Sequence, residues 1–176
     1  QQLMPEQQLI DIPEWWHLCG VALMAFMFLL NRYARTSNIV LIFFSQLPGV
    51  VLHELTHLAA GIMFRANPRG FSLIPKRNRL DSSWTLGSVT FDRVTAFNAV
   101  PIALAPLGLI PFSYFIYRSW FIWLAPTFSN VLMLYATVFL LIYNSIPSYQ
   151  DIRVACNWGS ILLYGGIAGA VMWYLW

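Results

Sequence analysis

Long apolar stretches separated by short polar segments dominate the pattern of the chain. A helix needs about 20 predominantly apolar residues to cross the hydrocarbon core of a bilayer. Five stretches approach or exceed that length: Trp15–Leu30, Ile39–Phe64, Ala96–Tyr117, Phe121–Tyr143 and Trp158–Trp176. The pattern predicts an all-α polytopic membrane protein with about five transmembrane helices, folded as one membrane-embedded domain over residues 1–176.

The composition supports a membrane protein and argues against a nucleic-acid-binding one. Hydrophobic residues make up 59% of the chain and charged residues only 10%, whereas soluble domains have about 25% charged residues. The formal net charge is +3. Most of the basic residues lie between apolar stretches, where they serve as membrane-flanking anchors rather than as a nucleic-acid surface.

The distribution of basic residues also predicts an orientation, because Lys and Arg near helix ends resist translocation. With five spans, the second and fourth loops share a side with the N-terminus. These loops hold seven basic residues, against three on the opposite side. We therefore expect an integral multi-pass protein with its N-terminus and active-site side in the cytoplasm, and its C-terminus outside.

The second apolar stretch contains the sequence His-Glu-Leu-Thr-His, in which the histidines are His53 and His57. On a helix these two side chains lie one turn apart on the same face, so both imidazoles can reach one metal ion, and Glu54 projects beside them. Zinc is the expected ion, because neutral imidazole suits it. Zinc lowers the pKa of a bound water towards about 7, and Glu54 is the expected general base.

The alternative interpretation is a pair of ordinary core histidines with a glutamate between them by chance. Ionisable groups inside a hydrocarbon-spanning helix cost several kcal/mol each unless they are paired or bind a metal, so three of them within five residues argue for a metal site. The remaining histidine, His17, follows two tryptophans at a predicted membrane interface, and there an anchoring role is expected.

A tetrahedral catalytic zinc needs a third protein ligand and keeps its fourth position open. Asp151 is the candidate, because it follows the fourth apolar stretch on the side of the membrane that the two histidines approach. Pro147 precedes it, and broken helices at membrane depth line buried or wet cavities. Two alternatives remain open: Asp151 is an interfacial charge paired with Arg153, or Cys156 supplies a thiolate ligand.

The sizeable polar segment, Arg65–Thr95, predicts a small β-hairpin directly after the motif helix. Two extended stretches, Gly70–Ile74 and Trp84–Phe91, flank the turn-rich Pro75–Ser83. Such a hairpin is either a connector or an edge strand that an extended peptide can join. Its place after the motif helix favours the peptide-binding interpretation.

The motif helix, the hairpin-like segment after it and a later Asn-x-x-Pro followed by an aspartate resemble the site-2 protease family of intramembrane zinc metalloproteases. The resemblance implies an HExxH core helix and a second core helix whose aspartate is the third zinc ligand. By this resemblance His53, His57 and Asp151 are zinc ligands, Glu54 is the general base, and Asn144 is a polar, substrate-binding group near the substrate backbone.

The second motif departs from the family pattern in three ways. Asp151 comes one residue early relative to Asn144, the second proline is missing, and Ile152 stands where the family has glycine. Ala105-Pro106 is similar to the Gly-Pro of the family's intervening helix in its proline alone. These features are typical of a divergent, minimal member without an inserted PDZ domain.

The hypothesis from the sequence is a zinc metalloendopeptidase that hydrolyses peptide bonds in or next to transmembrane segments of membrane-protein substrates, by Glu-assisted attack of zinc-bound water. The expected partners are a membrane-protein or peptide substrate and the lipid bilayer. One rival is a catalytically inactive zinc-binding membrane adaptor, against which the intact Glu54 argues. The other is a metal transporter, which needs further His or acidic ligands along its path, and the last three apolar stretches contain none.

Overall fold

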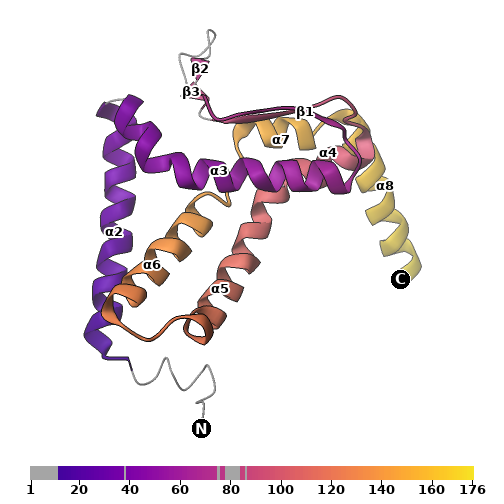
Figure 1. Ribbon diagram of the computed structural model, residues 1–176. Coiled ribbons are helices and arrows are strands. Elements are labelled where there is room, and N and C mark those ends of the chain that lie inside the picture. Colours follow the sequence, from indigo (N-terminus) through magenta and orange to yellow (C-terminus); the bar gives the residue numbers. More distant parts are fainter. Residues whose placement is uncertain (1–11, 38, 75, 78–83, 86) are drawn as a thin grey trace. The chain divides into compact units, whose positions relative to one another are not determined.

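The computed structural model describes residues 12–37, 39–74, 76–77, 84–85 and 87–176 (Figure 1). The chain divides into two compact units. The first comprises Gln1–Gly49 with Leu109–Ser145, and the second comprises Val50–Gly108 with Ile146–Trp176.

The first unit is a helical bundle. It contains α2 (Glu14–Ser37), the beginning of α3 (Ile39–Met63), α5 (Leu109–Trp123) and α6 (Phe128–Tyr143), and α6 packs against both α2 and α5 (Figure 1). Gly20 allows the close approach of α2 and α6, because a Cβ there would lie 2.3 Å from the ring of Tyr135. The buried core of this unit consists of Ile12, Phe121, Val131 and Leu134.

The second unit contains the rest of α3, the strands, and four further helical segments: α4 (Ala96–Ala103), the 3-10 helix η1 (Ala105–Gly108), α7 (Tyr149–Ala155) and α8 (Trp158–Leu175). A polar side chain caps the first turn of α4, α7 and α8. Thr95, Ser148 and Asn157 each accept a hydrogen bond from the backbone N–H three residues later. These caps explain why the helices begin where they do.

The predicted hairpin is confirmed. Strand β1 (Pro68–Ser72) pairs antiparallel with β4 (Ser88–Phe91), and β2 (Lys76–Arg77) pairs antiparallel with β3 (Trp84–Thr85). Of the predicted turn Pro75–Ser83, all but the two residues of β2 lies outside the described residues.

The hairpin packs on the motif helix at the end of α3. Arg65 and Asn67 both have a φ of 53°, a left-handed conformation that turns the chain sharply after α3. Gly61 of α3 lies beneath Phe91 of β4, since a Cβ at Gly61 would come within 2.1 Å of the Phe91 ring. Ala60, Ala66 and Ile102 are the buried residues of the adjoining core.

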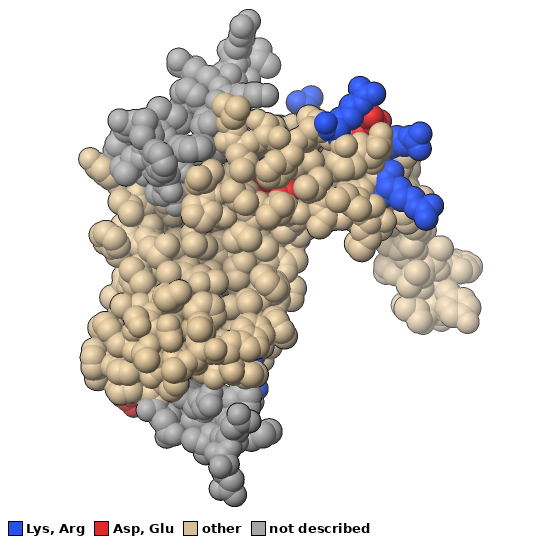
Figure 2. Space-filling view, in the orientation of Figure 1, with Lys and Arg blue, Asp and Glu red and all other residues tan. Residues whose placement is uncertain are grey.

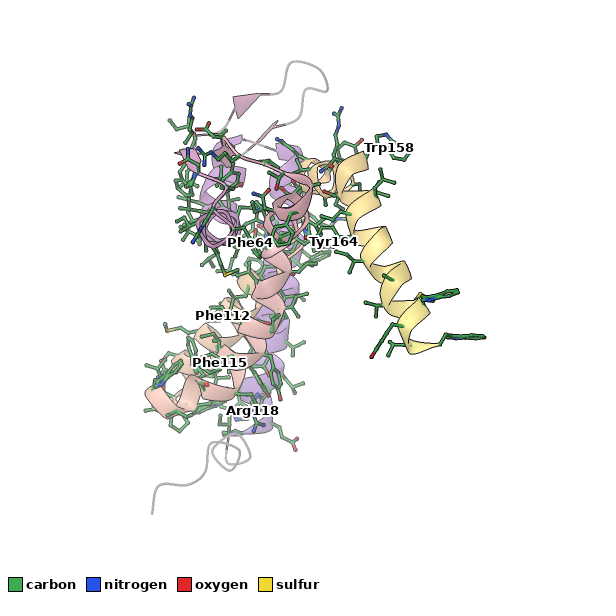
Figure 3. The ribbon with its side chains drawn as sticks, turned by 90° about the vertical axis from the view of Figure 1, so that its right-hand side faces the viewer. Phe64, Phe112, Phe115, Arg118, Trp158 and Tyr164 are labelled. Carbon is green, nitrogen blue, oxygen red and sulfur yellow. The ribbon has the colours of Figure 1, made fainter. Side chains whose placement is uncertain are left out.

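Two side-chain hydrogen bonds join α8 to α4. The Ser160 hydroxyl donates to the Ala96 carbonyl at 2.9 Å, and the Tyr164 hydroxyl donates to the Phe97 carbonyl at 2.5 Å. Trp158, in contrast, is 80% exposed. Figure 3 labels both Trp158 and Tyr164 on α8. The start of α8 is therefore anchored to α4, while most of the residues of α8 are exposed.

The prediction of about five transmembrane helices is wrong for the described part of the chain. Two helices there are long and apolar enough to cross a membrane, Glu14–Tyr33 of α2 and Trp158–Leu175 of α8. A third span results if α4 and the segment Ala105–Trp123 are counted together as one broken helix.

Local helix breaks explain the difference at two of the predicted spans, whereas for Ile39–Phe64 the described apolar segment is Leu47–Met63, which is shorter than a span. Leu104 ends α4 in the middle of the predicted span Ala96–Tyr117, and Pro106 follows within η1. The predicted span Phe121–Tyr143 is interrupted between Trp123 and Phe128, where Thr127 caps the 16-residue α6. Window hydropathy does not register such breaks, because the residues that form them are themselves apolar or small.

The orientation derived from basic residues stays a prediction, because the count presupposes five spans. Arg118, one of the three basic residues counted on the side opposite the N-terminus, lies within α5 rather than in a loop (Figure 3). On the face drawn in Figure 2, most of the surface carries no charged side chain, and Lys and Arg gather over the part of the second unit that holds β1 and α4.

Candidate metal centre

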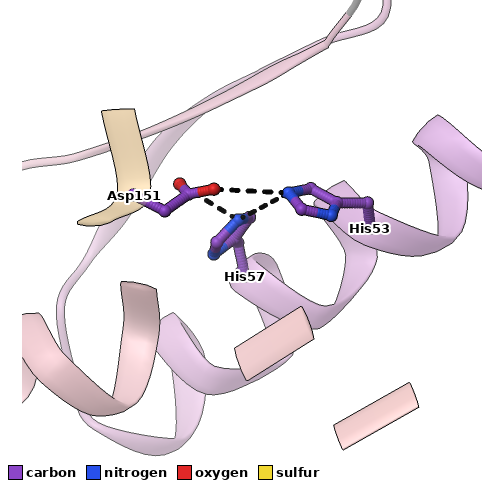
Figure 4. A group of neighbouring side chains, drawn as sticks. All are labelled: His53, His57 and Asp151. Carbon is purple, nitrogen blue, oxygen red and sulfur yellow. Dashed lines mark hydrogen bonds and ion pairs between the residues drawn. The ribbon is translucent and has the colours of Figure 1, made fainter. Parts of the chain in front are cut away.

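The second unit brings three predicted ligands together, His53, His57 and Asp151 (Figure 4). The two histidine Nε2 atoms are 3.2 Å apart. Asp151 Oδ2 lies 3.4 Å from His53 Nε2, and Asp151 Oδ1 lies 3.3 Å from His57 Nε2. The side chains are 14%, 7% and 17% exposed, in the order His53, His57 and Asp151. The sequence prediction of a His-His-Asp group that can hold a metal ion is confirmed.

The second ring nitrogen of His57 faces a backbone carbonyl. Its Nδ1 lies 2.7 Å from the Ile102 oxygen of α4, a distance at which Nδ1–H donates a strong hydrogen bond. Such a bond fixes the tautomer and leaves the Nε2 lone pair for a metal. The Ile102 carbonyl, which the Leu104 N–H also approaches at the end of α4, lacks its usual helical donor because Pro106, four residues later, has no N–H.

The N-terminus of α7 holds the Asp151 carboxylate in place. Ser148 and Asp151 form a capping box, in which the Ser148 backbone N–H donates to Asp151 Oδ2 at 2.7 Å. Burial alone raises the pKa of the Asp151 carboxyl, but the contacts with His53, His57 and Ser148 outweigh it and hold the pKa well below its usual range. The carboxylate is therefore anionic and pre-oriented.

This arrangement favours a positive charge between the ligand atoms. With Nδ1–H donating to Ile102, a neutral His57 points its Nε2 lone pair at the anionic Asp151 oxygen 3.3 Å away. Two lone pairs facing one another at that distance repel. Either a second proton on His57 or a bound cation relieves the repulsion, and three convergent ligand atoms favour the cation.

Glu54 lies beside the cluster on α3 and is only 9% exposed. Among the described residues its carboxylate accepts no hydrogen bond. Gly87, just before β4, lies directly against it: a Cβ at Gly87 would lie 2.7 Å from Glu54 Cγ. The predicted base is thus buried against the hairpin rather than tied to a polar partner.

The alternatives considered for the third ligand are not part of the cluster. Cys156 is the C-terminal cap of α7 and lines an apolar cavity of about 360 Å³ between α4, α7 and α8. Arg153 makes no ion pair with Asp151 within the described portion of the chain. Asp151 is therefore the carboxylate of the site.

Two other singled-out residues belong to the first unit. Asn144 caps the end of α6, and its side-chain amide donates to the Leu140 carbonyl at 2.9 Å, so its substrate-binding role stays a prediction. His17 lies 3.0 Å from the Tyr135 hydroxyl and is not among the residues of the cluster.

Sequence reasoning missed two contributors to the site, the Ile102 carbonyl and Gly87. A backbone carbonyl has no signature in the sequence, although Pro106 four residues later is a local sign that one is free. Gly87 lies between two short strands, where the sequence indicates only a turn residue. Its contact with Glu54 depends on how the hairpin packs on α3.

Comparisons with known proteins give no matching family model, no similar curated protein and no similar solved structure. The functional argument therefore rests on the chemistry of this chain's own residues.

Proposed function

We propose that this protein is an intramembrane zinc metalloendopeptidase. The carrying observation is the convergence of the three ligand groups: the two histidine Nε2 atoms lie 3.2 Å apart, and each lies 3.3 or 3.4 Å from a different oxygen of the Asp151 carboxylate. Zinc with bonds of about 2.0 to 2.1 Å in tetrahedral geometry separates its ligand atoms by about 3.3 Å. An octahedral ion with bonds of that length separates adjacent ligands by only about 2.9 Å. The separation of the two histidine nitrogens therefore fits two corners of a zinc tetrahedron, and the Asp151 carboxylate lies near enough to supply a third ligand.

The composition of the site is that of a catalytic rather than a structural centre. Structural zinc sites use four protein ligands, whereas catalytic sites use three and keep one position for water or substrate. This group has three. Bound zinc supplies a Lewis acid and lowers the pKa of water at the fourth position. Glu54, next to His53 in the chain, is suited to take the proton from the attacking water.

The setting favours a substrate in a membrane. α2 and α8 are long and apolar enough to cross a bilayer, and the motif segment Leu47–Met63 is itself apolar. An ionisable cluster on such a helix is costly unless it binds a metal. A peptide bond in or next to a transmembrane segment is the substrate that such a site can reach, and the hairpin beside α3 remains the predicted contact for an extended peptide.

The test compares wild-type protein with Glu54→Gln in zinc content and in cleavage of a panel of single-span membrane substrates. The amide preserves the size of the side chain but cannot accept a proton. We expect one zinc per chain in both proteins and a loss of hydrolysis of at least about 100-fold in the variant, the lower end of what a general base contributes.

The matched variants His53→Ala and His57→Ala should lose zinc and activity together. Undiminished turnover by Glu54→Gln would refute the assigned base, and metal flux into proteoliposomes would then support a transporter. A wild-type protein that holds zinc and cleaves nothing in the panel would instead support the adaptor.

A further inference from the structure

The Glu54 carboxylate needs a defined orientation if it is to act as a general base. A general base must lie within hydrogen-bond reach of the proton that it takes, so its position matters as much as its charge. Among the described residues no polar group holds the Glu54 carboxylate, although the side chain is only 9% exposed. Packing therefore contributes to its position, together with the electrostatic interactions with His53 and His57.

The packing partner is the backbone of the hairpin at Gly87. A Cβ built at this position would lie 2.7 Å from Glu54 Cγ, 3.0 Å from Glu54 Oε1 and 2.8 Å from Val50 Cγ1. Glu54 Cγ is not the free end of a side chain, so it cannot rotate away without moving the carboxylate. Only a residue without a side chain permits this approach.

A second contact two turns further along α3 holds the hairpin in this position. Phe91, at the end of β4, packs on Gly61, where an added Cβ would come within 2.1 Å of the ring. Gly61 follows Glu54 by seven residues, about 10 Å along a helix, and Phe91 follows Gly87 by four, about 13 Å along a strand. The two distances differ by only about 3 Å, so the contacts at Gly61 and Gly87 hold β4 against α3 at both ends of the strand.

We propose that Gly87 is a positioning residue for the base: its lack of a side chain lets the hairpin backbone close on Glu54 and hold the carboxylate beside the metal cluster. This inference rests on the proposed function, in which Glu54 is the base. It adds that the hairpin is part of the catalytic apparatus in addition to any contact with substrate.

The first arm of the test measures the full-length Gly87→Ala protein in detergent or lipid. We expect kcat to fall by about 100-fold, the effect of a displacement of about 1 Å at a catalytic group, with zinc content and KM nearly unchanged. Gly70→Ala is the matched control in the same hairpin. There the added Cβ would meet only the hydroxyl of Thr90, at 2.8 Å, and this side chain can rotate, so kcat should stay at the wild-type value.

The second arm detects the contact between Gly87 and Glu54 without measuring activity. Thermal unfolding midpoints are compared for wild type, Gly87→Ala, Glu54→Ala and the double variant. If the alanine methyl collides with Glu54, truncating Glu54 removes the obstacle, so the midpoint loss caused by Gly87→Ala should shrink by half or more in the Glu54→Ala background.

The two arms separate failure of the inference from failure of the proposed function. Full activity in Gly87→Ala, or an equal midpoint loss in both backgrounds, would overturn the role of Gly87. A wild-type chain that binds zinc without cleaving peptides would overturn the peptidase proposal, and the unfolding cycle would still decide whether Gly87 sets the position of Glu54.

Discussion

His57 uses both of its ring nitrogens, and this determines what the site can bind. Nδ1 lies 2.7 Å from the Ile102 carbonyl, and Nε2 lies 3.3 Å from an Asp151 oxygen. A histidine whose Nδ1–H is committed to a carbonyl presents a fixed, more basic Nε2 to a metal. The residue is therefore prepared as a ligand before any ion arrives.

Asp151 has two functions at once, and substitutions can separate them. Its carboxylate accepts the hydrogen bond from the Ser148 N–H that caps α7, and it also completes the ligand cluster. Asparagine preserves an acceptor for the cap but removes the anionic ligand. We expect Asp151→Asn to fold normally while its zinc affinity falls by at least about 100-fold, more than the loss of an outer partner costs. Equilibrium dialysis against zinc and circular dichroism measure the two effects.

Cys156→Ala is the control, because Cys156 is the C-terminal cap residue of the same helix through its backbone N–H and does not belong to the ligand cluster. It should keep wild-type zinc content and activity. If Cys156→Ala loses the metal while Asp151→Ala retains it, the third ligand has been assigned to the wrong residue, although the two histidines would still stand.

For single residues, the sequence was sufficient to predict the side chains of the candidate metal site, but not the backbone groups that position them. The spacing of His53 and His57 follows from helical geometry, and Asp151 stood out by its place after a proline. The partners that position these groups are a carbonyl and a glycine. Neither has a side chain of its own to mark it, so tertiary packing is needed to find them.

Helix ends supply the groups that orient two of the three ligands of the metal centre. The N-terminus of α7 orients Asp151, and the C-terminal part of α4 supplies the Ile102 carbonyl. In a continuous helix that carbonyl would accept from the N–H of residue 106. Pro106 has no N–H, so the break in α4 that reduced the number of spans also provides the hydrogen-bond acceptor for His57.

Pro106→Ala should therefore weaken metal binding without removing a ligand. The new N–H competes with His57 Nδ1 for the Ile102 carbonyl, so the imidazole is less firmly held. We expect zinc affinity to fall by about 10-fold to 100-fold, the usual cost of losing an outer-shell partner. Competition with a chelator of known affinity measures this change.

Pro126→Ala is the matched control, since this proline lies in the connection between α5 and α6 of the other unit. Its zinc affinity should equal that of the wild type. An unchanged affinity in Pro106→Ala would show that the bond between His57 and Ile102 does not support metal binding.

The hairpin and most helix positions were predictable at the element scale, but the number of spans was not. β1 and β4 occupy the extended stretches that flank the turn-rich segment, with shifts of a few residues. The error in the spans came from joining apolar residues across Leu104 and across the segment between Trp123 and Phe128. Hydropathy reports which residues avoid water, and it does not report where the backbone stops being helical.

At the scale of the whole molecule, α8 gives the most direct test of membrane insertion. Its segment Trp158–Leu175 has 18 residues without a charge, and only 6% of that window is buried within the protein. A surface this apolar and this uncovered is unfavourable in water and suits lipid. Its first turn follows Cys156, which is exposed, and its last residue precedes Trp176.

The two ends of α8 should therefore label from opposite sides of the membrane. In a Cys19→Ala background, an impermeant maleimide should reach Cys156 only from the cytoplasmic side, the side that the sequence analysis predicts for the segment between the fourth and fifth apolar stretches. With Cys156 also replaced by alanine, Trp176→Cys should label from outside intact cells. Permeabilised cells provide the control, because both positions should then react.

Labelling of both positions from one side would show that α8 does not cross the bilayer. Labelling of Cys156 from outside and of position 176 from inside would keep the span but reverse the orientation, because the ends of a crossing helix must exchange sides together.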